Sequence, residues 1–417
     1  MDPRLSQTSS PRKVVVIGAG AAGLVAADFS ARYGAEVLLL EGTKHVGKKI
    51  LISGGGRCNI LPAELDESRF VTDSSRNTLN RILRSWPLTE QIRYFEHELG
   101  VRLVEEAGTG KLFPASQRAR DVRDALLQHA ERGGVRLCTD CLVTEIRSVN
   151  DAWRIEIRDA PAIHADAVII ATGGLSIPTT GSDGFGFRFA ESFGIATAPR
   201  YPALVPVTSS DTRFTSLAGI SIDVRISASS TRHSAEARGA LLFTHRGYSG
   251  PAVLDVSHVL ARATTEGDAN ARLRVSWLSH DELFWMDTLW HDSRGTAAGA
   301  LRRELPERLV STLMDVANVD ASRTLAQLRR EEKRRLLDVL LRCALPWTGD
   351  EGYRKAEVTG GGVLLSEIQH GSMECKAHPG LYFCGETLDV FGPIGGYNFF
   401  WAWATGRAAG ISAATKE

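Results

Sequence analysis

Three glycines and one glutamate near the start of the chain have the types and spacing that bind a dinucleotide. Gly18, Gly20 and Gly23 follow the β-branched run Lys13–Ile17 and precede a stretch with helical pattern. Gly18 permits a tight turn, Gly20 lets a pyrophosphate approach the backbone, and Gly23 lets helix and strand pack closely. The free N–H groups at the start of that helix attract phosphate oxygens. Glu41 would accept hydrogen bonds from the adenosine ribose hydroxyls.

The elements that must position these residues are a strand, a glycine turn, a helix and a second strand. The apolar run Lys13–Ile17 is typical of a buried parallel strand. The helical pattern continues to about Tyr33, Gly34 is a plausible helix stop, and Glu36–Leu40 is the second buried strand. The complete unit predicts a Rossmann-like α/β fold, but it does not choose between NAD and FAD.

Three later segments favour FAD. A buried strand ends in Thr172, Gly173 and Gly174, whose glycines would let the chain turn under a dinucleotide. A second strand is closed by Gly385 and Glu386, and a carboxylate there can bind the ribitol hydroxyls that FAD has and NAD lacks. The segment 395–398 opens an apolar helix whose N-terminus could stabilise the negative charge of reduced flavin.

A glycine-rich segment follows the second strand. Gly54, Gly55 and Gly56 are consecutive, and cations flank them on both sides. This pattern suggests backbone amides placed against an anion or a ring edge. The alternative is a flexible surface loop, and the position just after Glu41 favours contact with the flavin.

Charge and cysteine content limit the classes of partner. The 417 residues include 49 Lys and Arg against 49 Asp and Glu, which argues against a main role in binding nucleic acid or anionic lipid. Six sparse cysteines fit a reducing compartment. The uncharged run 14–27 is broken by glycines and too short to span a bilayer. We therefore expect a cytoplasmic protein with a small-molecule substrate, no nucleic acid and no membrane, and the oligomeric state stays open.

The motifs carry a family resemblance. The chain resembles the aminoacetone-oxidase-like or NAD(P)/FAD-dependent oxidoreductase flavoproteins, a family that includes a flavoprotein of bacterial bile-acid dehydroxylation. The matching blocks span nearly the whole chain, and Phe243–Pro251 and Gly385–Asp389 are the most specific strings. The resemblance implies a glutathione-reductase-like, Rossmann-like FAD-binding domain made of both chain ends, with a β-rich subdomain and a helical subdomain inserted. We expect the FAD domain at 1–200 and 349–417, the β-rich part at 201–278, and the helical part at 279–348.

Motifs and resemblance together predict the residues that contact FAD, with backbone near Val143 facing the adenine as the family implies. The predicted contacts are Gly18, Gly20, Ala21, Ala22, Gly23, Glu41, Gly42, Lys48, Lys49, Ser53, Gly54, Gly55, Arg57, Cys58, Asn59, Val143, Ala171, Thr172, Gly173, Gly385, Glu386, Asp389, Gly395, Gly396, Tyr397 and Asn398. We expect no metal site.

The catalytic acid or base stays open among four candidates. His245 and Tyr248 could donate protons to a substrate, or they could instead fix a tight turn. Arg57 could stabilise reduced flavin or contact FAD phosphate. Cys58 could be a nucleophile, but no second cysteine lies a few residues away, so we expect a packing or flavin-adjacent thiol. The CxxC spacing of the pair at 138 and 141 is not expected to carry a redox or metal role.

The expected activity is that of an FAD-dependent oxidoreductase with hydride transfer through flavin N5. The resemblance favours NAD(P)H-driven reduction of an unsaturated organic substrate. Two alternatives stay open: an oxygen-using oxidase of a small amine, and a flavin-containing RNA-modification or regulatory binding protein. Only one strand–glycine turn–helix unit is present, so NAD(P)H, if it is the electron donor, would bind transiently over the flavin.

Overall fold

The computed structural model describes residues 10–277, 282–290 and 295–415, which form two units. The first unit contains the chain up to Arg200 and again from Val358, and the second is Tyr201–Glu357. The chain returns to the first unit at Val358, whereas we expected this return at residue 349. Strand β18 (Gly349–Asp350) accounts for the difference, because it pairs with β12 (Val207–Thr208) in the sheet of the second unit. The expected boundary between residues 278 and 279 lies outside the described residues.

A five-stranded parallel sheet forms the centre of the first unit, in the order β20-β10-β1-β2-β6. Its strands are β1 (Lys13–Ile17), β2 (Glu36–Leu40), β6 (Arg136–Cys138), β10 (Ala167–Ile170) and β20 (Leu381–Phe383). The register aligns Val14 with Val37 on one side and with Ala167 on the other. The central strands are apolar runs without alternation, because helices or other segments cover both faces of such a sheet.

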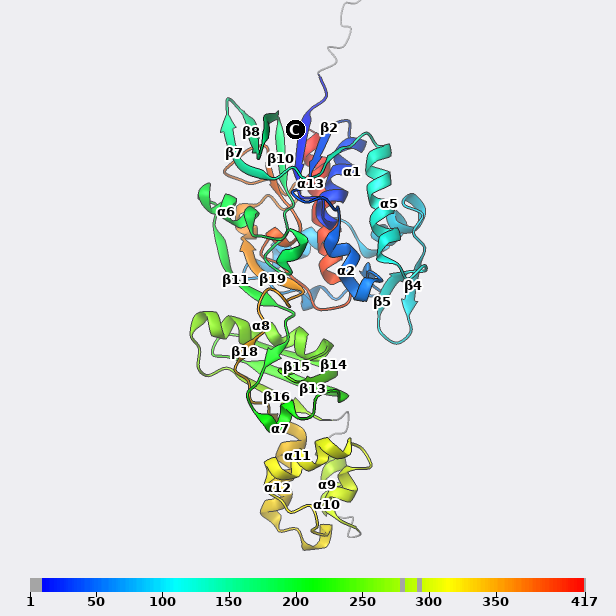
Figure 1. Ribbon diagram of the computed structural model, residues 1–417, viewed down its shortest axis with the longest axis vertical. Coiled ribbons are helices and arrows are strands. Elements are labelled where there is room, and N and C mark those ends of the chain that lie inside the picture. The colour runs from blue at the N-terminus through cyan, green and yellow to red at the C-terminus, as the bar shows by residue number, and fades with distance from the viewer. Residues whose placement is uncertain (1–9, 278–281, 291–294, 416–417) are drawn as a thin grey trace, which may run out of the picture. The chain divides into compact units, whose positions relative to one another are not determined.

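Helices α1 (Ala21–Arg32) and α13 (Tyr397–Ala414) pack against each other beside this sheet (Figure 1). Two glycines of α13 permit a close approach of the two backbones. A Cβ on Gly406 would lie 2.4 Å from the carbonyl oxygen of Ala22, and one on Gly410 would lie 2.3 Å from that of Ala26. The last helix of the chain therefore packs directly on the helix that follows the glycine turn.

Smaller antiparallel sheets and further helices complete the first unit, with strand orders β3-β5-β4 and β7-β8-β9. These strands are β3 (Leu61–Pro62), β4 (Leu103–Glu106), β5 (Lys111–Pro114), β7 (Val143–Val149), β8 (Ala152–Ile157) and β9 (Ala160–Ala165). The helices are α2 (Lys48–Gly56), α3 (Arg76–Arg84), α4 (Leu88–Arg93), α5 (Ala119–Arg132) and α6 (Phe185–Ser192). Strand β11 (Thr197–Ala203) pairs with β19 (Val358–Val363).

The second unit is built on a seven-stranded sheet in the order β17-β16-β13-β14-β15-β12-β18. Its other strands are β12 (Val207–Thr208), β13 (Ser221–Ser229), β14 (Ser234–Thr244), β15 (Gly247–Ser249), β16 (Arg272–Ser276) and β17 (Cys343–Ala344). Residues alternate between buried and exposed along β13, as expected for a sheet with one covered face. Helix α8 (Pro251–Glu266) packs against β13 and β14.

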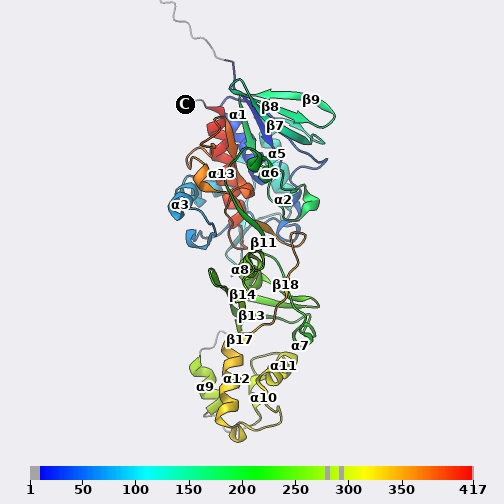
Figure 2. The ribbon, with the colours of Figure 1, turned by 90° about the vertical axis from the view of Figure 1, so that its left-hand side faces the viewer.

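Four further helices of the described residues lie in the chain between β16 and β17, and they are close together in Figure 2. They are α9 (Glu282–Trp290), α10 (Ala297–Leu301), α11 (Glu307–Ala317) and α12 (Arg330–Arg342). Trp277 and Trp285 are buried in the same hydrophobic core as the sheet. The predicted fold class, a Rossmann-like α/β domain with a β-rich and helical insertion, is confirmed. Across the described parts of the chain, every helix is too short or too polar to cross a membrane.

Candidate cofactor site

The carboxyl ends of the parallel strands bring the predicted cofactor residues to one edge of the sheet. Gly18 follows β1, Glu41 follows β2, the segment 171–174 follows β10, and Glu386 follows β20. In open parallel sheets this edge is where ligands bind. Segments separated by more than three hundred residues in sequence therefore meet because their strands are neighbours in the sheet.

The glycine turn after β1 fits a dinucleotide. Gly18 has a φ of 101°, and a Cβ there would lie 2.5 Å from the carbonyl oxygen of Ala171. A Cβ on Gly23 would lie 1.8 Å from the carbonyl oxygen of Gly18, so helix and strand require both glycines. At Gly20, by contrast, a Cβ would meet no protein atom within 4 Å. Helix α1 starts after Gly20 with no side-chain cap, so its first amides, from Ala21 onward, are suited to phosphate oxygens.

The Glu41 carboxylate is held at the turn by backbone donors. Its Oε2 accepts a hydrogen bond from the amide of Ala19 at 3.0 Å. Its Oε1 accepts from the amide of Thr43 at 3.0 Å and from the Thr43 hydroxyl at 2.7 Å. A carboxylate has about four acceptor positions, so this arrangement orients Glu41 and leaves it able to accept a hydrogen bond from a ribose hydroxyl.

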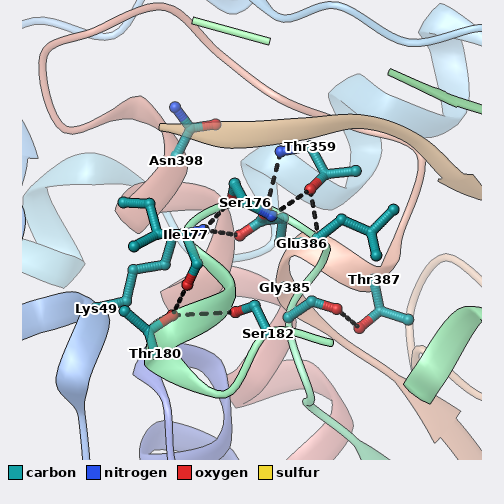
Figure 3. A network of polar contacts seen from close by, with 12 residues as sticks. Lys49, Ser176, Ile177, Thr180, Ser182, Thr359, Gly385, Glu386, Thr387 and Asn398 are labelled. Atoms are coloured by element: carbon teal, nitrogen blue, oxygen red, sulfur yellow. Dashed lines mark hydrogen bonds and ion pairs between the residues drawn. The ribbon is translucent and has the colours of Figure 1, made fainter. Parts of the chain in front are cut away.

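Glu386 is the centre of a polar network that joins three other segments (Figure 3). Its Oε2 accepts a hydrogen bond from the ammonium of Lys49 at 2.5 Å. Its Oε1 accepts from the hydroxyl of Ser176 at 2.8 Å and from the amide of Thr359 at 2.8 Å. Lys49 also donates to the Ser176 hydroxyl at 2.5 Å. Glu386 therefore fixes the relative positions of three elements, which are α2, strand β19 and the segment that follows β10. This role is separate from any contact of Glu386 with a ribitol chain.

Ser176 and Thr359 were not among the predicted site residues. Ser176 is fully buried, and the Thr359 hydroxyl accepts hydrogen bonds from the amides of Leu175 at 2.7 Å and Ser176 at 3.2 Å. A Cβ on Gly174 would lie 2.4 Å from the Thr359 hydroxyl and 2.7 Å from Glu386 Oε1. A local signal existed, because Ser176 follows two glycines and Thr359 precedes three, but neither has a charge that would mark it.

The glycine-rich loop ends the helical part of α2. The backbone leaves the helical region at Ser53, and Gly54, Gly55 and Gly56 all have positive φ angles. These glycines are exposed. Arg57 lies beside them, with its guanidinium 4.4 Å from the ring centre of Phe113 and 2.7 Å from Glu106 Oε1. Arg57 is thus anchored by an acid and a ring, whereas Lys48 on the same segment is partly exposed.

Cys58 and Asn59 are buried behind this loop. Burial raises the pKa of the Cys58 thiol to about 12, so the thiolate is scarce at neutral pH. Cys58 is therefore a packing residue, as we expected, rather than a nucleophile. The Asn59 amide, oriented to satisfy its neighbours, accepts from the amide of Gly396 at 3.1 Å and donates to the carbonyls of Leu61 and Leu112.

The N-terminus of α13 carries the second predicted cofactor segment of the C-terminal region. Gly396, with a φ of 87°, precedes the helix, which has no side-chain cap, and a Cβ there would lie 2.3 Å from the carbonyl carbon of Leu61. Asn398 uses its amide to pair with the backbone of Gly392, at 2.9 Å in both directions. The Tyr397 hydroxyl accepts from the amide of Asp66 at 3.4 Å. The uncapped amides of the first turn are therefore the cofactor-facing groups here.

Asp389 holds a different loop. Its Oδ2 accepts hydrogen bonds from the Thr72 hydroxyl at 3.1 Å, the Asp73 amide at 2.9 Å and the Ser74 hydroxyl at 3.1 Å. Ser74 in turn accepts from the amide of Leu365 at 2.9 Å. Burial, together with the nearby Asp73 charge, raises the pKa of the Asp389 carboxyl to about 6. Asp389, predicted as a cofactor contact, makes its hydrogen bonds to the protein itself.

The remaining predicted contacts also lie in the first unit. The Thr172 hydroxyl accepts from the amide of Gly186 at 3.2 Å, and the carbonyl of Gly173 accepts from the Thr387 hydroxyl at 3.3 Å. Gly385 donates its amide to the Thr405 hydroxyl at 2.9 Å. Val143 is the first residue of β7, outside the parallel sheet.

The two candidate acids of the second unit differ in position. His245 is exposed in the turn between β14 and β15. Tyr248 is fully buried in β15, and its hydroxyl donates to the carbonyl of Pro346 at 2.9 Å. Burial raises the pKa of the Tyr248 hydroxyl above its ordinary range. Tyr248 therefore stabilises the sheet of this unit, and the structure does not support the role of proton donor that we considered for it.

Cys138 and Cys141 are joined by a disulfide at the carboxyl end of β6. The expectation that this spacing carries no redox or metal role stays a prediction. The other four cysteines are free and buried. Within the described ranges, no cluster of three or more His, Cys, Asp or Glu side chains is arranged to hold a metal ion.

Comparison with known proteins identifies the family of the chain. The model of the family described as HI0933-like protein Rossmann domain matches residues 12–412. The chain is 32% identical over 405 residues to the ribosomal RNA dihydrouridine synthase of Escherichia coli, covering 94% of this chain and 96% of that protein. It is 31% identical over 412 residues to the 3-dehydro-bile acid delta(4,6)-reductase of Clostridium scindens, covering 97% and 99%.

A solved structure shows the same fold. The 3-ketosteroid-delta4-(5alpha)-dehydrogenase of Rhodococcus jostii RHA1 superposes with a TM-score of 0.50 and 16% identity, over 99% of both chains. The glycine turn, the uncapped helix starts and the carboxyl-edge acids fit FAD, and the resemblance found in the motifs is confirmed. The chain therefore belongs to the HI0933-like protein Rossmann domain family and is an FAD-dependent oxidoreductase.

Proposed function

We propose that this protein uses FAD to reduce a carbon–carbon double bond conjugated to a carbonyl group, with NAD(P)H as the reductant. The observation that carries the proposal is the similarity, over nearly the full length of both chains, to two reductases. Uridine has a double bond beside a carbonyl, and so does a 3-oxo steroid with a double bond at position 4. The names of the two relatives thus describe the same change of bond in different substrates.

The positions of the side chains support this reaction type. When bound, FAD supplies hydride transfer at its N5 atom. The first-turn amides of α13 and the Lys49 ammonium offer positive charge at the edge where the predicted cofactor residues meet. Cys58 is buried and its thiol is neutral at physiological pH, so chemistry through a dithiol beside the flavin is disfavoured.

The source of electrons follows from the architecture. The first unit contains one parallel sheet with one glycine turn, and the sheet of the second unit is antiparallel. A separate Rossmann domain for a nicotinamide is therefore not available among the described residues. We infer that NADH or NADPH binds transiently, delivers its hydride and leaves before the substrate enters.

We propose a small enone as the substrate, because the net charge of the chain is zero and RNA binding depends on neutralising phosphates. Uridine in ribosomal RNA is the second candidate, and the similarity to the ribosomal RNA enzyme favours it. An oxygen-using amine oxidase is the third candidate. It is less well supported, because the name of one relative describes a reduced product and the name of the other describes a reductase.

Anaerobic stopped-flow spectroscopy of the FAD-loaded protein tests these choices. We expect NADH or NADPH to bleach the flavin absorbance, and a steroid or cyclic enone to restore it. Restoration by a ribosomal RNA transcript, with none by enones, would establish the second candidate. Bleaching by small amines but by neither nicotinamide would contradict the reductase proposal.

A further inference from the structure

The disulfide between Cys138 and Cys141 has no role in the function proposed above. Both residues are partly exposed, whereas Cys58, Cys343 and Cys375 are buried, so small thiols and disulfides can reach this pair. In the first unit the pair closes the turn that leads from β6 to β7, and Asp140 within it has a left-handed backbone with a φ of 55°. Closely spaced cysteines of this kind exchange between dithiol and disulfide forms in other proteins.

This cysteine turn is hydrogen-bonded to the residues that follow β2. The amide of Glu41 donates to the carbonyl of Cys138 at 2.8 Å, and the amide of Cys141 donates to the carbonyl of Glu41 at 2.9 Å. The amide of Asp140 donates to the carbonyl of Thr43 at 3.2 Å. The backbone of Glu41 is therefore clamped on both sides by the two cysteines.

Side-chain packing adds to the clamp. A Cβ on Gly42 would lie 3.1 Å from the side chain of Leu142, which is closer than most Cβ contacts in proteins. Thr43 holds Glu41 Oε1, and the other carboxylate oxygen accepts from the amide of Ala19 in the glycine turn. The geometry of the cysteine turn is thus transmitted, through Glu41, to the turn that receives the dinucleotide.

We propose that Cys138 and Cys141 form a reversible thiol–disulfide site that sets the affinity of the protein for FAD. The oxidised form holds Glu41 in the orientation seen here and binds FAD more tightly. In the reduced form the cysteine turn loses a covalent constraint, so more conformations of Glu41 become accessible and binding must overcome this added entropy.

The oxidant is a low-molecular-weight disulfide such as oxidised glutathione. One cysteine thiolate attacks a sulfur of the oxidant, the sulfur–sulfur bond of the oxidant breaks, and one glutathione thiolate leaves. The second cysteine thiolate then attacks the protein-bound sulfur, which forms the Cys138–Cys141 bond and releases a second glutathione. Two electrons pass from the protein to the oxidant, and the two protons of the cysteine thiols are taken up by the released thiolates.

Thermodynamic linkage makes the effect reciprocal. If the disulfide tightens FAD binding by some factor, then FAD favours the disulfide by the same factor. For this two-electron couple a tenfold factor corresponds to a shift of about 30 mV in the midpoint potential. Two independent measurements on the same full-length protein must therefore agree.

The experiment uses apoprotein equilibrated with reduced or oxidised glutathione, with the disulfide counted by mass spectrometry after alkylation. FAD titration followed by flavin fluorescence is expected to give binding about fivefold or more tighter in the oxidised form, which equals about 1 kcal/mol. A glutathione titration with and without FAD is expected to show the matching shift toward a more stable disulfide.

Two variants separate the clamp from general effects of oxidation. The double variant Cys138→Ser, Cys141→Ser is expected to bind FAD with the affinity of the reduced wild type in either buffer. The control Cys375→Ser leaves the pair intact and is expected to keep the full response. Equal FAD affinity for the dithiol and disulfide forms of the wild type would overturn the proposal, and so would a failure of oxidised glutathione to form the disulfide. Neither outcome bears on the substrate of the flavin.

Discussion

Lys49 and Glu386 lie 337 residues apart in the sequence, yet their ammonium and carboxylate are 2.5 Å apart at the carboxyl edge of the parallel sheet. Their side chains are 26% and 16% exposed. The pair connects the helix after β2 with the segment after β20, and Ser176 contacts both partners. The wall of the cofactor site is therefore assembled from both ends of the chain before any cofactor contact is made.

Glu386→Gln is expected to destabilise the first unit and to weaken FAD binding. The change leaves the Lys49 ammonium without its counter-charge in a largely buried place, where breaking a fully buried pair costs about 3–5 kcal/mol. Because the pair is partly exposed, we expect a loss of about 1–3 kcal/mol in the free energy of unfolding. Urea denaturation followed by circular dichroism measures it.

Glu67→Gln is the matched control for this change. It breaks the ion pair with Arg84, whose side chain is 69% exposed, and is expected to alter stability by less than about 0.5 kcal/mol. If both variants lose the same stability, the network around Glu386 has no special role.

Gly20→Ala should separate cofactor binding from folding. Gly20 has a negative φ, and a Cβ there meets no protein atom within 4 Å, so the apoprotein is expected to keep its stability within about 0.5 kcal/mol. The methyl group would occupy the space into which a pyrophosphate enters. We expect FAD affinity to fall about tenfold or more, or about 1.4 kcal/mol, measured by flavin fluorescence titration.

Gly371→Ala serves as the neutral comparison, because a Cβ there also meets nothing within 4 Å. It is expected to bind FAD as the wild type does. An unchanged FAD affinity in Gly20→Ala would show that the glycine turn does not approach the cofactor.

The raised pKa of the Asp389 carboxyl predicts that the free energy of unfolding depends on pH. Its pKa is about 6 in the folded protein because of burial, against about 3.9 when unfolded. Well below pH 4 the group is protonated in both states, and its contribution to stability is fully present. As the pH rises through 6, the unfolded state releases its proton first, and the folded state loses about 3 kcal/mol relative to it.

Asp389→Asn removes this titration. The difference in unfolding free energy between variant and wild type is expected to shift in favour of the variant by about 2 kcal/mol between pH 4 and pH 7. Urea denaturation at four pH values in this range tests the slope. A difference that stays constant with pH would contradict the prediction.

Cys58 is expected to be dispensable for electron transfer. With a thiol pKa of about 12, only about one molecule in ten thousand carries the thiolate at pH 8. Iodoacetamide at this pH should leave Cys58 unlabelled in the native protein, whereas reduced Cys138 and Cys141 should react. Cys58→Ala is expected to keep the rate of flavin reduction within about twofold of the wild type, and a loss of a hundredfold would restore the nucleophile hypothesis.

Local patterns predicted the parts of the fold that depend on neighbours in sequence. Gly18 and Gly20 lie between β1 and α1, and Gly23 lies in the first turn of α1, as the spacing predicted. Strand β14 likewise pairs with β13 over nine residues, within the β-rich part that we expected at 201–278. In both cases the contacts that determine the local structure join residues that are close in sequence. The residue types at these positions therefore indicate the structure directly.

The network around Glu386 could not be predicted in the same way. Ser176 and Thr359 reach Glu386 because β20 lies next to β10 and because β19 approaches the same edge. The neighbouring glycines mark both residues as parts of turns, but neither residue has a charge that would signal a contact with Glu386. Ser176 and Thr359 reach Glu386 only because of the order of strands in the sheet. The sequence pattern does not specify that order.

The close packing of Gly406 and Gly410 on Ala22 and Ala26 has a consequence for biosynthesis. Translation delivers α1 first and α13 last, so the second unit, which is encoded between them, emerges whole before the cofactor unit can bury its first helix. FAD can therefore meet its finished site only after α13 has left the ribosome. A unit that is built from two separated segments completes its folding only after the second segment has been synthesised.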